Sequence, residues 1–408
     1  MEPLRFAVVG TGGMGRNHIR CLRETHEVEL VAICDIHEPT ARQVAEEYDV
    51  VCYLDHREML EEEELDAITI ATPHPIHPVV AIDAADAGVH VFTEKPMATT
   101  PADADAMVRA AARADVKLGV MYQQRTVARN QKAKQILDSG QLGELYRAEL
   151  IAAGYRSQAY YDSAPWRGTW TGEGGGVLYN QAPHRLDLFQ WLVGLPARLI
   201  ALNSTYLHDI ECEDIATAIL EFPNGAHGII HAGTVEAPGQ NRIELCGDSG
   251  KLVLDDALRI ARSQPSIREF TFATKEMWAK LETSWEDIDV PEQESGHKVC
   301  IQDFARAILD DREPMIPGDE GVRSVELACA MTLSSHRRTW VDIPVDRAEY
   351  DALIAELCQE PTPKRRRRRK KPTAAPRAAA KARSARKPAK RKTAATKARK
   401  KAAKSRRR

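Results

Sequence analysis

Residues 4–15 of the chain read LRFAVVGTGGMG, and this stretch decides the fold of the N-terminal half. Residues 4–9 form a compact apolar run that predicts a buried β-strand, and the glycines after it predict a tight turn. An amphipathic stretch over residues 14–23 then predicts a helix. A second apolar run, residues 28–34, ends in Asp35. Strand, glycine turn, helix, strand and acidic residue, in this order, are typical of a dinucleotide-binding βαβ unit.

The glycines of this turn have separable roles in binding a dinucleotide. Gly10 permits the tight turn, Gly12 lets the backbone approach a pyrophosphate, and Gly15 allows the helix to pack closely on the strand. The helix N-terminus offers unpaired N–H groups to the phosphates. Asp35 is expected to accept hydrogen bonds from the adenosine ribose and to repel a 2′-phosphate, which favours NAD over NADP. The alternative role for Asp35 is a helix N-cap.

Strands and helices continue to alternate as far as residue 121. The pattern predicts a helix over 39–48, a strand over 66–71, a helix over 76–87, a strand over 90–93, a helix capped by Thr100 and a strand over 117–121. Such alternation predicts a parallel, doubly wound α/β sheet whose ligands gather at the carboxyl ends of the strands. Two polar segments, TPHPIH at 72–77 and EKP at 94–96, follow predicted strands and belong at that edge.

The second half of the chain has a different pattern of apolar runs and turn residues. Short β-rich runs separated by turn signals predict an antiparallel sheet, and the runs are 145–155, 197–206, 215–222, 226–235 and 242–246. Pro223-Asn224-Gly225 between two of these runs predicts a hairpin. Helical patterns over 299–309 and 322–339 are expected to pack back against the first half.

A central helix is predicted to begin near Asn180. Pro183 lacks an N–H group and is tolerated only in a first helical turn, which places His184 in that turn. Asn180 and His184 are four residues apart and would share one helix face. The glycines at 174–176 precede this helix, so His184 is expected to reach into a cleft, although a structural histidine is the alternative.

Four motifs in this order, GTGGMG at 10–15, ATPHPIH at 71–77, EKP at 94–96 and GGGVLYNQAPHRLDLFQWL at 174–192, resemble those of the glucose-fructose oxidoreductase and inositol dehydrogenase (Gfo/Idh/MocA) family. The resemblance covers about residues 4–345. It implies a Rossmann domain that binds the nicotinamide cofactor (1–122). It also implies a second, α+β domain (123–358), with a large, mostly antiparallel, open-faced sheet that commonly serves in oligomerisation.

The resemblance also implies a set of reacting groups. The family uses the EKP lysine, a histidine and an aspartate, which fall here on Lys95, His184 and position 180. Position 180 is asparagine, and Ala182 replaces a glycine, so no carboxylate relay is available at position 180 itself. His184 is assigned as general base and Lys95 as the ammonium group near the alkoxide, with an exchange of these roles left open. The sequence is closer to members with an N-Q-x-P-H motif, among them dihydrodiol-type phthalate dehydrogenases.

The expected binding residues fall into two groups. The cofactor group comprises Gly10, Gly12, Gly13, Met14, Gly15, Asp35, Thr72, His74, His77, Glu94, Lys95 and Gln123. The substrate group comprises Tyr122, Arg125, Trp166, Arg167, Asn180 and His184. A core position is the alternative for Tyr122 and for one of Trp166 and Trp170. Apart from His74 and His77, the histidines show no clustered spacing, so no metal site is predicted.

The charges are segregated along the chain. Of its 408 residues, 57 are Lys or Arg, and 24 of these lie in 364–408, a segment without Asp or Glu. Residues 1–363 therefore carry a net charge of −26. The tail over 359–408 is expected to be disordered, and its Lys/Arg/Ala-rich texture resembles the tails of histone H1-like proteins. It would bind nucleic acid nonspecifically or fold back on the acidic body.

Eight scattered cysteines without a C-x-x-C pair predict reduced thiols. The N-terminus has no signal-peptide pattern and no apolar run approaches the roughly 18 residues of a membrane span, so a cytoplasmic protein is expected.

Three functional hypotheses remain open at this point. The leading one is an NAD-dependent oxidoreductase that transfers a hydride between nicotinamide and a secondary hydroxyl of a sugar, glycoside or cyclic polyol. The second is a glycosidase that retains its NAD, oxidises C3 transiently and eliminates the aglycone. The third is a non-catalytic, NAD-binding regulator that associates with nucleic acid through the tail. The presence of both Lys95 and His184 argues against the third.

Overall fold

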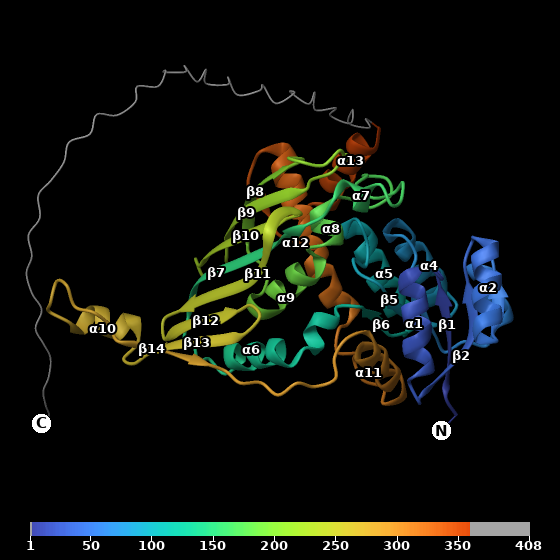
Figure 1. Ribbon diagram of the computed structural model, residues 1–408, viewed down its shortest axis with the longest axis horizontal. Coiled ribbons are helices and arrows are strands. Elements are labelled where there is room, and N and C mark those ends of the chain that lie inside the picture. The colour runs from blue at the N-terminus through green and yellow to red at the C-terminus, as the bar shows by residue number, and fades with distance from the viewer. Residues whose placement is uncertain (1, 360–408) are drawn as a thin grey trace, which may run out of the picture. The chain divides into compact units, whose positions relative to one another are not determined.

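The computed structural model describes residues 2–359, so the tail predicted over 359–408 lies, apart from its first residue, outside the described residues. The N-terminal half contains a parallel six-stranded sheet with the order β3-β2-β1-β4-β5-β6 (Figure 1). Its strands are β1 (Leu4–Val9), β2 (Val28–Cys34), β3 (Val51–Tyr53), β4 (Ala67–Ile70), β5 (His90–Thr93) and β6 (Leu118–Val120). The predicted doubly wound sheet is thereby confirmed.

Helices connect successive strands of this sheet, and they are α1 (Gly13–Arg23), α2 (Glu38–Tyr48), α3 (His56–Glu62), α4 (His77–Asp86) and α5 (Pro101–Ala114). Thr100 caps α5 by accepting a hydrogen bond from the backbone N–H of Asp103, and Pro101 stands at the start of the helix. The sequence analysis did not place β3 or α3. Both are short, and no residue of β3 is fully buried, so neither leaves a strong apolar pattern.

The second half contains a mixed sheet of nine strands, ordered β14-β13-β12-β11-β7-β10-β9-β8-β15. Its strands are β7 (Leu145–Tyr155), β8 (Arg198–Ser204), β9 (Ile215–Glu221), β10 (His227–Gly233), β11 (Val235–Gly247), β12 (Gly250–Leu254), β13 (Leu258–Ser263), β14 (Thr283–Asp287) and β15 (Val341–Asp342). All neighbouring pairs are antiparallel except β7 with β10. The prediction of a large, mostly antiparallel sheet is confirmed, and the predicted hairpin joins β9 to β10.

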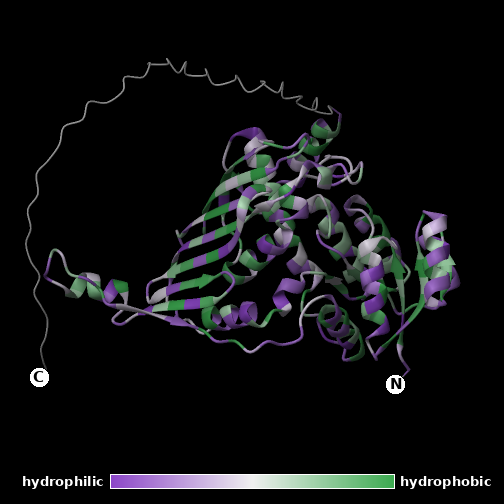
Figure 2. Cartoon of the chain, viewed as in Figure 1, coloured by the Kyte–Doolittle hydropathy of each residue, from purple (hydrophilic) through white to green (hydrophobic). Residues whose placement is uncertain are grey.

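Helices cover one face of the nine-stranded sheet. The principal ones are α6 (Ala128–Asp138), α9 (Pro183–Val193) and α12 (Gly318–Arg337). Helix α12 packs on β8 of this sheet and also on α5 and β6 of the first half, so it joins the two halves. The outer face is open, and the strands show alternating apolar and polar bands (Figure 2). Leu202, Ile219 and Ile229 are exposed on these strands.

Smaller elements complete the described chain: the 3₁₀ turns η1 (His74–Ile76) and η2 (Gln123–Thr126), and the helices α7 (Gln158–Tyr161), α8 (Val177–Asn180), α10 (Ile267–Ala273), α11 (His297–Leu309) and α13 (Arg347–Gln359). The sequence analysis did not predict α10 and β14, which project from the end of the sheet (Figure 1). Helix α10 has no buried residue, and every residue of β14 is exposed, so no apolar periodicity marks them. No helix within residues 2–359 is long and apolar enough to span a membrane.

The expected central helix is interrupted. Asn180 ends the short α8, whereas Pro183 opens α9 and His184 is the second residue of that helix. The expectation that Asn180 and His184 share the face of one continuous helix is therefore wrong. The reason is Pro183, which cannot donate a backbone hydrogen bond into the preceding turn and so starts a new helix.

Candidate active site

A cavity of about 880 Å³ lies at the carboxyl ends of β1, β2, β4 and β5. Its wall includes most of the residues expected to bind the cofactor: Gly10, Gly12, Gly13, Met14, Asp35, Thr72, His74, His77, Glu94 and Lys95. Trp166 and Arg167, which were expected to bind substrate, line the same cavity. Gly15 and Gln123 are not part of the wall. The structure thus brings the glycine turn, both polar segments and the Trp166-Arg167 pair together.

The glycine turn is shaped by close approaches of the backbone. Gly10 has φ +91°, and a Cβ atom there would meet the carbonyl oxygen of Ala71 at 2.7 Å. A Cβ at Gly15 would lie 1.8 Å from the carbonyl oxygen of Gly10, so a larger residue would push α1 off the strand. By contrast, nothing lies within 4 Å of a Cβ built at Gly12 or Gly13. Gly15 therefore shapes the turn, while Gly12 and Gly13 leave space at the N-terminus of α1.

Asp35 follows β2 and anchors the adjacent loops. Its Oδ2 accepts hydrogen bonds from the backbone N–H and the hydroxyl of Thr11, at 2.8 and 2.9 Å, and its Oδ1 accepts one from the N–H of His37 at 2.9 Å. It does not cap α2, because the N-cap residue of that helix is His37. The carboxylate therefore stands on the cavity wall in a fixed orientation.

The two histidines of the segment after β4 have different surroundings. The Nδ1 of His77 lies 3.0 Å from the Pro96 carbonyl oxygen, and its Nε2 lies 2.8 Å from that of Thr72. This ring ties together the two loops that follow β4 and β5. His74 Nδ1 donates instead to the Glu173 carbonyl oxygen at 3.0 Å, a contact between the two halves of the chain. Burial lowers the pKa of His74 to about 3, so this ring is neutral.

Glu94 of the EKP motif is buried between two histidines that the sequence analysis did not single out. His18 Nε2 lies 3.0 Å from Glu94 Oε1, and His297 Nε2 lies 3.6 Å from the same atom. Burial opposes ionisation of Glu94, but the hydrogen bond with His18, the nearby His297 ring and the charge of Lys95 hold its pKa well below the usual range. The only signal in the sequence for His18 is its position one turn beyond Gly15 on α1.

Lys95 and His184 come from opposite halves of the chain, and the charge of Lys95 acts on the buried His184 ring. Lys95 Nζ donates a hydrogen bond to the backbone carbonyl of Asn180 at 3.2 Å. Burial lowers the pKa of Lys95, and the carboxylates of Glu94 and Glu173 oppose that shift. Burial and the nearby charge of Lys95 lower the pKa of His184 to about 3. The Nδ1 of His184 has no hydrogen-bond partner within residues 2–359.

Glu173, which precedes the glycines of the 174–176 loop, was not predicted as a site residue from the sequence. Its Oε2 accepts a hydrogen bond from the backbone N–H of Gly168 at 2.5 Å, and its Oε1 accepts one from the side-chain amide of Asn180. The Arg167 guanidinium lies 3.9 Å from Glu173 Oε1. Only 1% of Glu173 is exposed, and burial raises the pKa of its carboxyl. A lone glutamate beside a glycine run carries no recognisable pattern, so its role depends on the fold.

Trp166 and Arg167 lie on the loop before that glutamate. The Arg167 guanidinium lies 4.3 Å from the centre of the Trp166 ring and 4.5 Å from that of Tyr160, and it donates to the Tyr160 hydroxyl at 2.7 Å. The Nε of Arg167 has no partner in the described chain. Trp170 is instead buried against His336, so it is the member of the tryptophan pair that belongs to the core.

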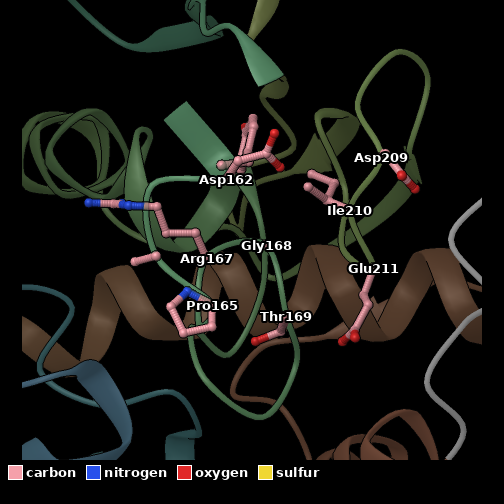
Figure 3. Close-up of a pocket in the computed structure, with 10 residues that line it drawn as sticks. Asp162, Pro165, Arg167, Gly168, Thr169, Asp209, Ile210 and Glu211 are labelled. Atoms are coloured by element: carbon pink, nitrogen blue, oxygen red, sulfur yellow. The ribbon is translucent and has the colours of Figure 1, made fainter. Parts of the chain in front are cut away.

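Arg167 also borders a smaller cavity of about 220 Å³ (Figure 3). Three carboxylates stand around it on two segments, Asp162 on one and Asp209 and Glu211 on the other. In Figure 3 the Arg167 side chain extends away from Asp209 and Glu211. Arg167 therefore forms part of the partition between the two cavities.

Two expected substrate ligands are corrected by the structure. Tyr122 is fully buried, and its hydroxyl forms a hydrogen bond with Ser324 while its ring packs edge-on against His184. Arg125 is also buried, and its guanidinium forms two hydrogen bonds with Asp187, at 2.6 and 2.9 Å, and a third with Glu320. Neither side chain lines a cavity described above. Both positions follow β6, and the chain turns them into the core rather than toward the cleft.

Within residues 2–359, no three His, Cys, Asp or Glu side chains converge in a way that could hold a metal ion.

Comparisons with known proteins agree with this architecture. Residues 4–122 match the family described as "Oxidoreductase family, NAD-binding Rossmann fold". Residues 130–253 match the family described as "GFO/IDH/MocA C-terminal domain".

Two curated relatives span most of the chain. A myo-inositol 2-dehydrogenase from Thermotoga maritima is 23% identical over 347 residues, which cover 83% of this chain and 98% of that protein. A D-apiose dehydrogenase from Paraburkholderia graminis is 28% identical over 364 residues, covering 87% of this chain and 94% of that one.

Among solved structures, the WlbA dehydrogenase from Bordetella pertussis, in complex with NADH and UDP-GlcNAcA, superposes with a TM-score of 0.72. It is 30% identical in sequence, and the alignment covers 85% of this chain and 100% of that protein. Together with the two matched domains, this similarity shows that the chain is a member of the Gfo/Idh/MocA family of oxidoreductases with an NAD-binding Rossmann fold.

Proposed function

We propose that the protein oxidises a secondary hydroxyl of a sugar, glycoside or cyclic polyol and transfers the hydride to NAD. The observation that carries this proposal is that Lys95 lines a cavity of about 880 Å³ at the strand ends and is near enough for its charge to lower the pKa of His184, from the other half of the chain. The dehydrogenases named among its relatives act on inositol and apiose, which are compounds of this kind.

The cavity fits a dinucleotide. Gly12 and Gly13 leave open space at the N-terminus of α1, and no side chain caps that helix, so its N–H groups remain free for phosphates. Asp35 offers carboxylate oxygens to a ribose at the other end of the turn. When bound, the nicotinamide supplies the hydride acceptor for the reaction.

Lys95 is the better candidate for the group that takes up the hydroxyl proton. A general base must be available in its unprotonated form, and burial lowers the pKa of Lys95 below that of an exposed lysine. His184, with a pKa of about 3, is a far weaker base. We therefore exchange the roles that the sequence suggested. In the oxidation, the Lys95 amine accepts the hydroxyl proton, while the neutral His184 ring forms a hydrogen bond with the same oxygen.

Trp166 and Arg167 suit the recognition of the rest of the substrate. An indole stacks on the apolar face of a sugar ring, and the guanidinium of Arg167, which lines the cavity, can donate to a hydroxyl or a carboxylate. WlbA from B. pertussis was crystallised with UDP-GlcNAcA, a nucleotide-linked sugar acid. Substrates of that class therefore belong in the test beside free sugars and polyols.

The deciding experiment is a substrate panel read by NADH absorbance, with inositols, aldoses, glycosides and UDP-linked sugar acids. Release of NADH in proportion to substrate would support the dehydrogenase. Turnover of a glycoside without net NADH would instead support the NAD-retaining glycosidase. Binding of NAD with no turnover of any compound would contradict both enzymatic proposals and favour the regulator.

We also propose a homo-oligomer. Apolar side chains stand on the open face of the nine-stranded sheet, with Leu202 73% and Ile219 55% exposed, and association of two copies would cover them. The basic tail, whose proposed partner is nucleic acid or the acidic body, lies outside the described residues.

A further inference from the structure

The family's aspartate is absent at position 180, yet a buried carboxylate lies beside Asn180. We propose that Glu173 takes over that carboxylate's part as a positioning residue, by orienting the Asn180 amide toward the reacting hydroxyl and by keeping Lys95 basic through its negative charge. This inference rests on the proposed function, because it concerns the same reacting groups.

The first support is the way Glu173 is held. Its two oxygens accept hydrogen bonds from different donors, the N–H of Gly168 at 2.5 Å and the Asn180 amide. Its own backbone carbonyl accepts a hydrogen bond from His74. The carboxylate is thus fixed at both ends and cannot swing away from Asn180.

The second support is what this contact does to Asn180. An amide group has a donor end and an acceptor end, and Glu173 accepts only from the donor end. The side-chain oxygen Oδ1 must therefore point to the opposite side. No hydrogen bond to Oδ1 is formed within the described residues, whereas the backbone oxygen of Asn180 is occupied by Lys95 Nζ. An acceptor with one fixed orientation is thus available on the residue that holds Lys95, where it can receive a substrate hydroxyl.

The third support is the energetic cost of a buried charge. Glutamine at position 173 could accept from the Gly168 N–H equally well, so capping that loop does not require a carboxylate. Burial raises the pKa of Glu173, which means that the ionised form is costly at this place. The Arg167 guanidinium, 3.9 Å from Glu173 Oε1, offsets part of this cost, and the negative charge also acts on Lys95. Lys95 lies near enough for Glu173 to raise the pKa of its ammonium group.

A charge-exchange pair of variants tests this proposal. In Glu173→Gln, an amide replaces the carboxylate that accepts the hydrogen bond from the Asn180 amide. We expect kcat/KM to fall by at least about tenfold. Asn180→Asp alone places two carboxylates against each other and should also impair turnover. In the double variant, the new amide at position 173 donates to the new carboxylate at position 180 and still accepts from Gly168, so kcat/KM should return to within about threefold of the parent value. A double variant no better than the product of the two single losses would overturn the proposal.

The matched control is Glu211→Gln. Glu211 is a carboxylate that also accepts a backbone N–H, from Trp170 at 3.3 Å, but it does not contact Asn180. Its substitution should leave kcat/KM within about twofold of the parent. An equal loss in this control would show that removing any nearby carboxylate disturbs the loop, and the proposal would then be wrong.

A readout without substrate separates this inference from the proposed function. The pKa of Lys95 can be followed by NMR after reductive ¹³C-methylation, with Lys95→Arg to assign the signal. We expect a lower pKa in Glu173→Gln and recovery in the double variant. If the parent oxidises nothing on the panel, the proposed function fails, while the Lys95 titration still tests Glu173. An unchanged Lys95 pKa in Glu173→Gln would overturn the inference.

Discussion

Lys95 Nζ, at the end of the Rossmann sheet, donates a hydrogen bond of 3.2 Å to the backbone carbonyl of Asn180, which belongs to the second half of the chain. The two residues are 85 positions apart in the sequence. Because the acceptor is a backbone atom, the contact depends on the path of the loop and not on the side chain at position 180. Asparagine in place of the family's aspartate therefore leaves the hydrogen bond of Lys95 intact. The carboxylate that contacts position 180 is that of Glu173.

Removal of either reacting group should nearly abolish turnover. Lys95→Ala and His184→Ala are each expected to lower kcat at least about a hundredfold, the usual loss for a positioned acid-base group. His184 does not line the cavity of about 880 Å³ that is proposed to hold NAD. His184→Ala should therefore bind NAD with the parent affinity in calorimetry. If either variant kept more than about half of the parent rate, its residue would have no part in proton transfer.

Asp35 predicts the choice of cofactor. Its carboxylate is fixed by three hydrogen bonds on the cavity wall, where it would repel a 2′-phosphate. The ratio of kcat/KM for NAD over NADP should be at least about ten, equivalent to roughly 1.4 kcal/mol. Asp35→Ser should reduce this ratio toward one. Equal use of both cofactors by the parent enzyme would contradict the assignment.

Glu213 should make stability depend on pH. Burial raises its pKa to about 7, above the value of about 4.3 expected for an unfolded chain. A carboxyl with a raised folded-state pKa contributes stability below its unfolded pKa, and that contribution is lost as the pH rises through about 7. Glu213→Gln can still accept the N–H groups of Gly176 and Leu178 but cannot ionise.

The thermal unfolding midpoint of Glu213→Gln should therefore exceed that of the parent at pH 8, and the difference should shrink toward pH 5. If the difference between the two thermal midpoints is the same at every pH from 5 to 8, Glu213 does not titrate in this range.

Arg125 should matter for stability, because it forms a buried ion pair with Asp187 in which the two side chains are only 1% and 0% exposed. Arg125→Ala leaves a buried carboxylate without its partner and should lower the free energy of unfolding by about 3–5 kcal/mol. The control Arg42→Ala breaks an exposed pair with Glu38 and should cost less than about 1 kcal/mol. Chemical denaturation measures both, and similar losses would refute the structural role given to Arg125.

The tail prediction concerns residues 364–408 and is tested by truncation after Pro363. If the tail binds nucleic acid, full-length protein should retard arbitrary duplex DNA at low salt and the truncated protein should not. In a plot of the logarithm of the DNA-binding constant against the logarithm of the salt concentration, the slope should then be near −0.9 for each phosphate neutralised. Binding that survives truncation, or no binding at about 50 mM salt, would remove this role. Sugar oxidation should persist in the truncated enzyme, since no reacting group lies in the tail.

The fold class follows from the sequence alone, because the strongest signals in the sequence are local. A buried strand, a tight glycine turn and an amphipathic helix each leave a short-range pattern, so β1, α1 and β2 were predicted almost to the residue. Asp35 could be singled out for the same reason, since it ends the second strand, whereas Lys95 and His184 were assigned through the resemblance of their motifs to those of the family. Elements without apolar periodicity, such as β3 and α10, could not be predicted.

Which side chains face one another depends instead on how the elements pack in three dimensions. The sequence placed Asn180 with His184 on one helix, whereas the break at Pro183 turns the asparagine amide toward Glu173. It placed Arg125 in the cleft, whereas packing of η2 on α9 buries that arginine against Asp187. Both outcomes depend on contacts between segments distant along the chain or on a local change of direction. Spacing along the chain does not encode such contacts, because they arise when separately formed elements pack together.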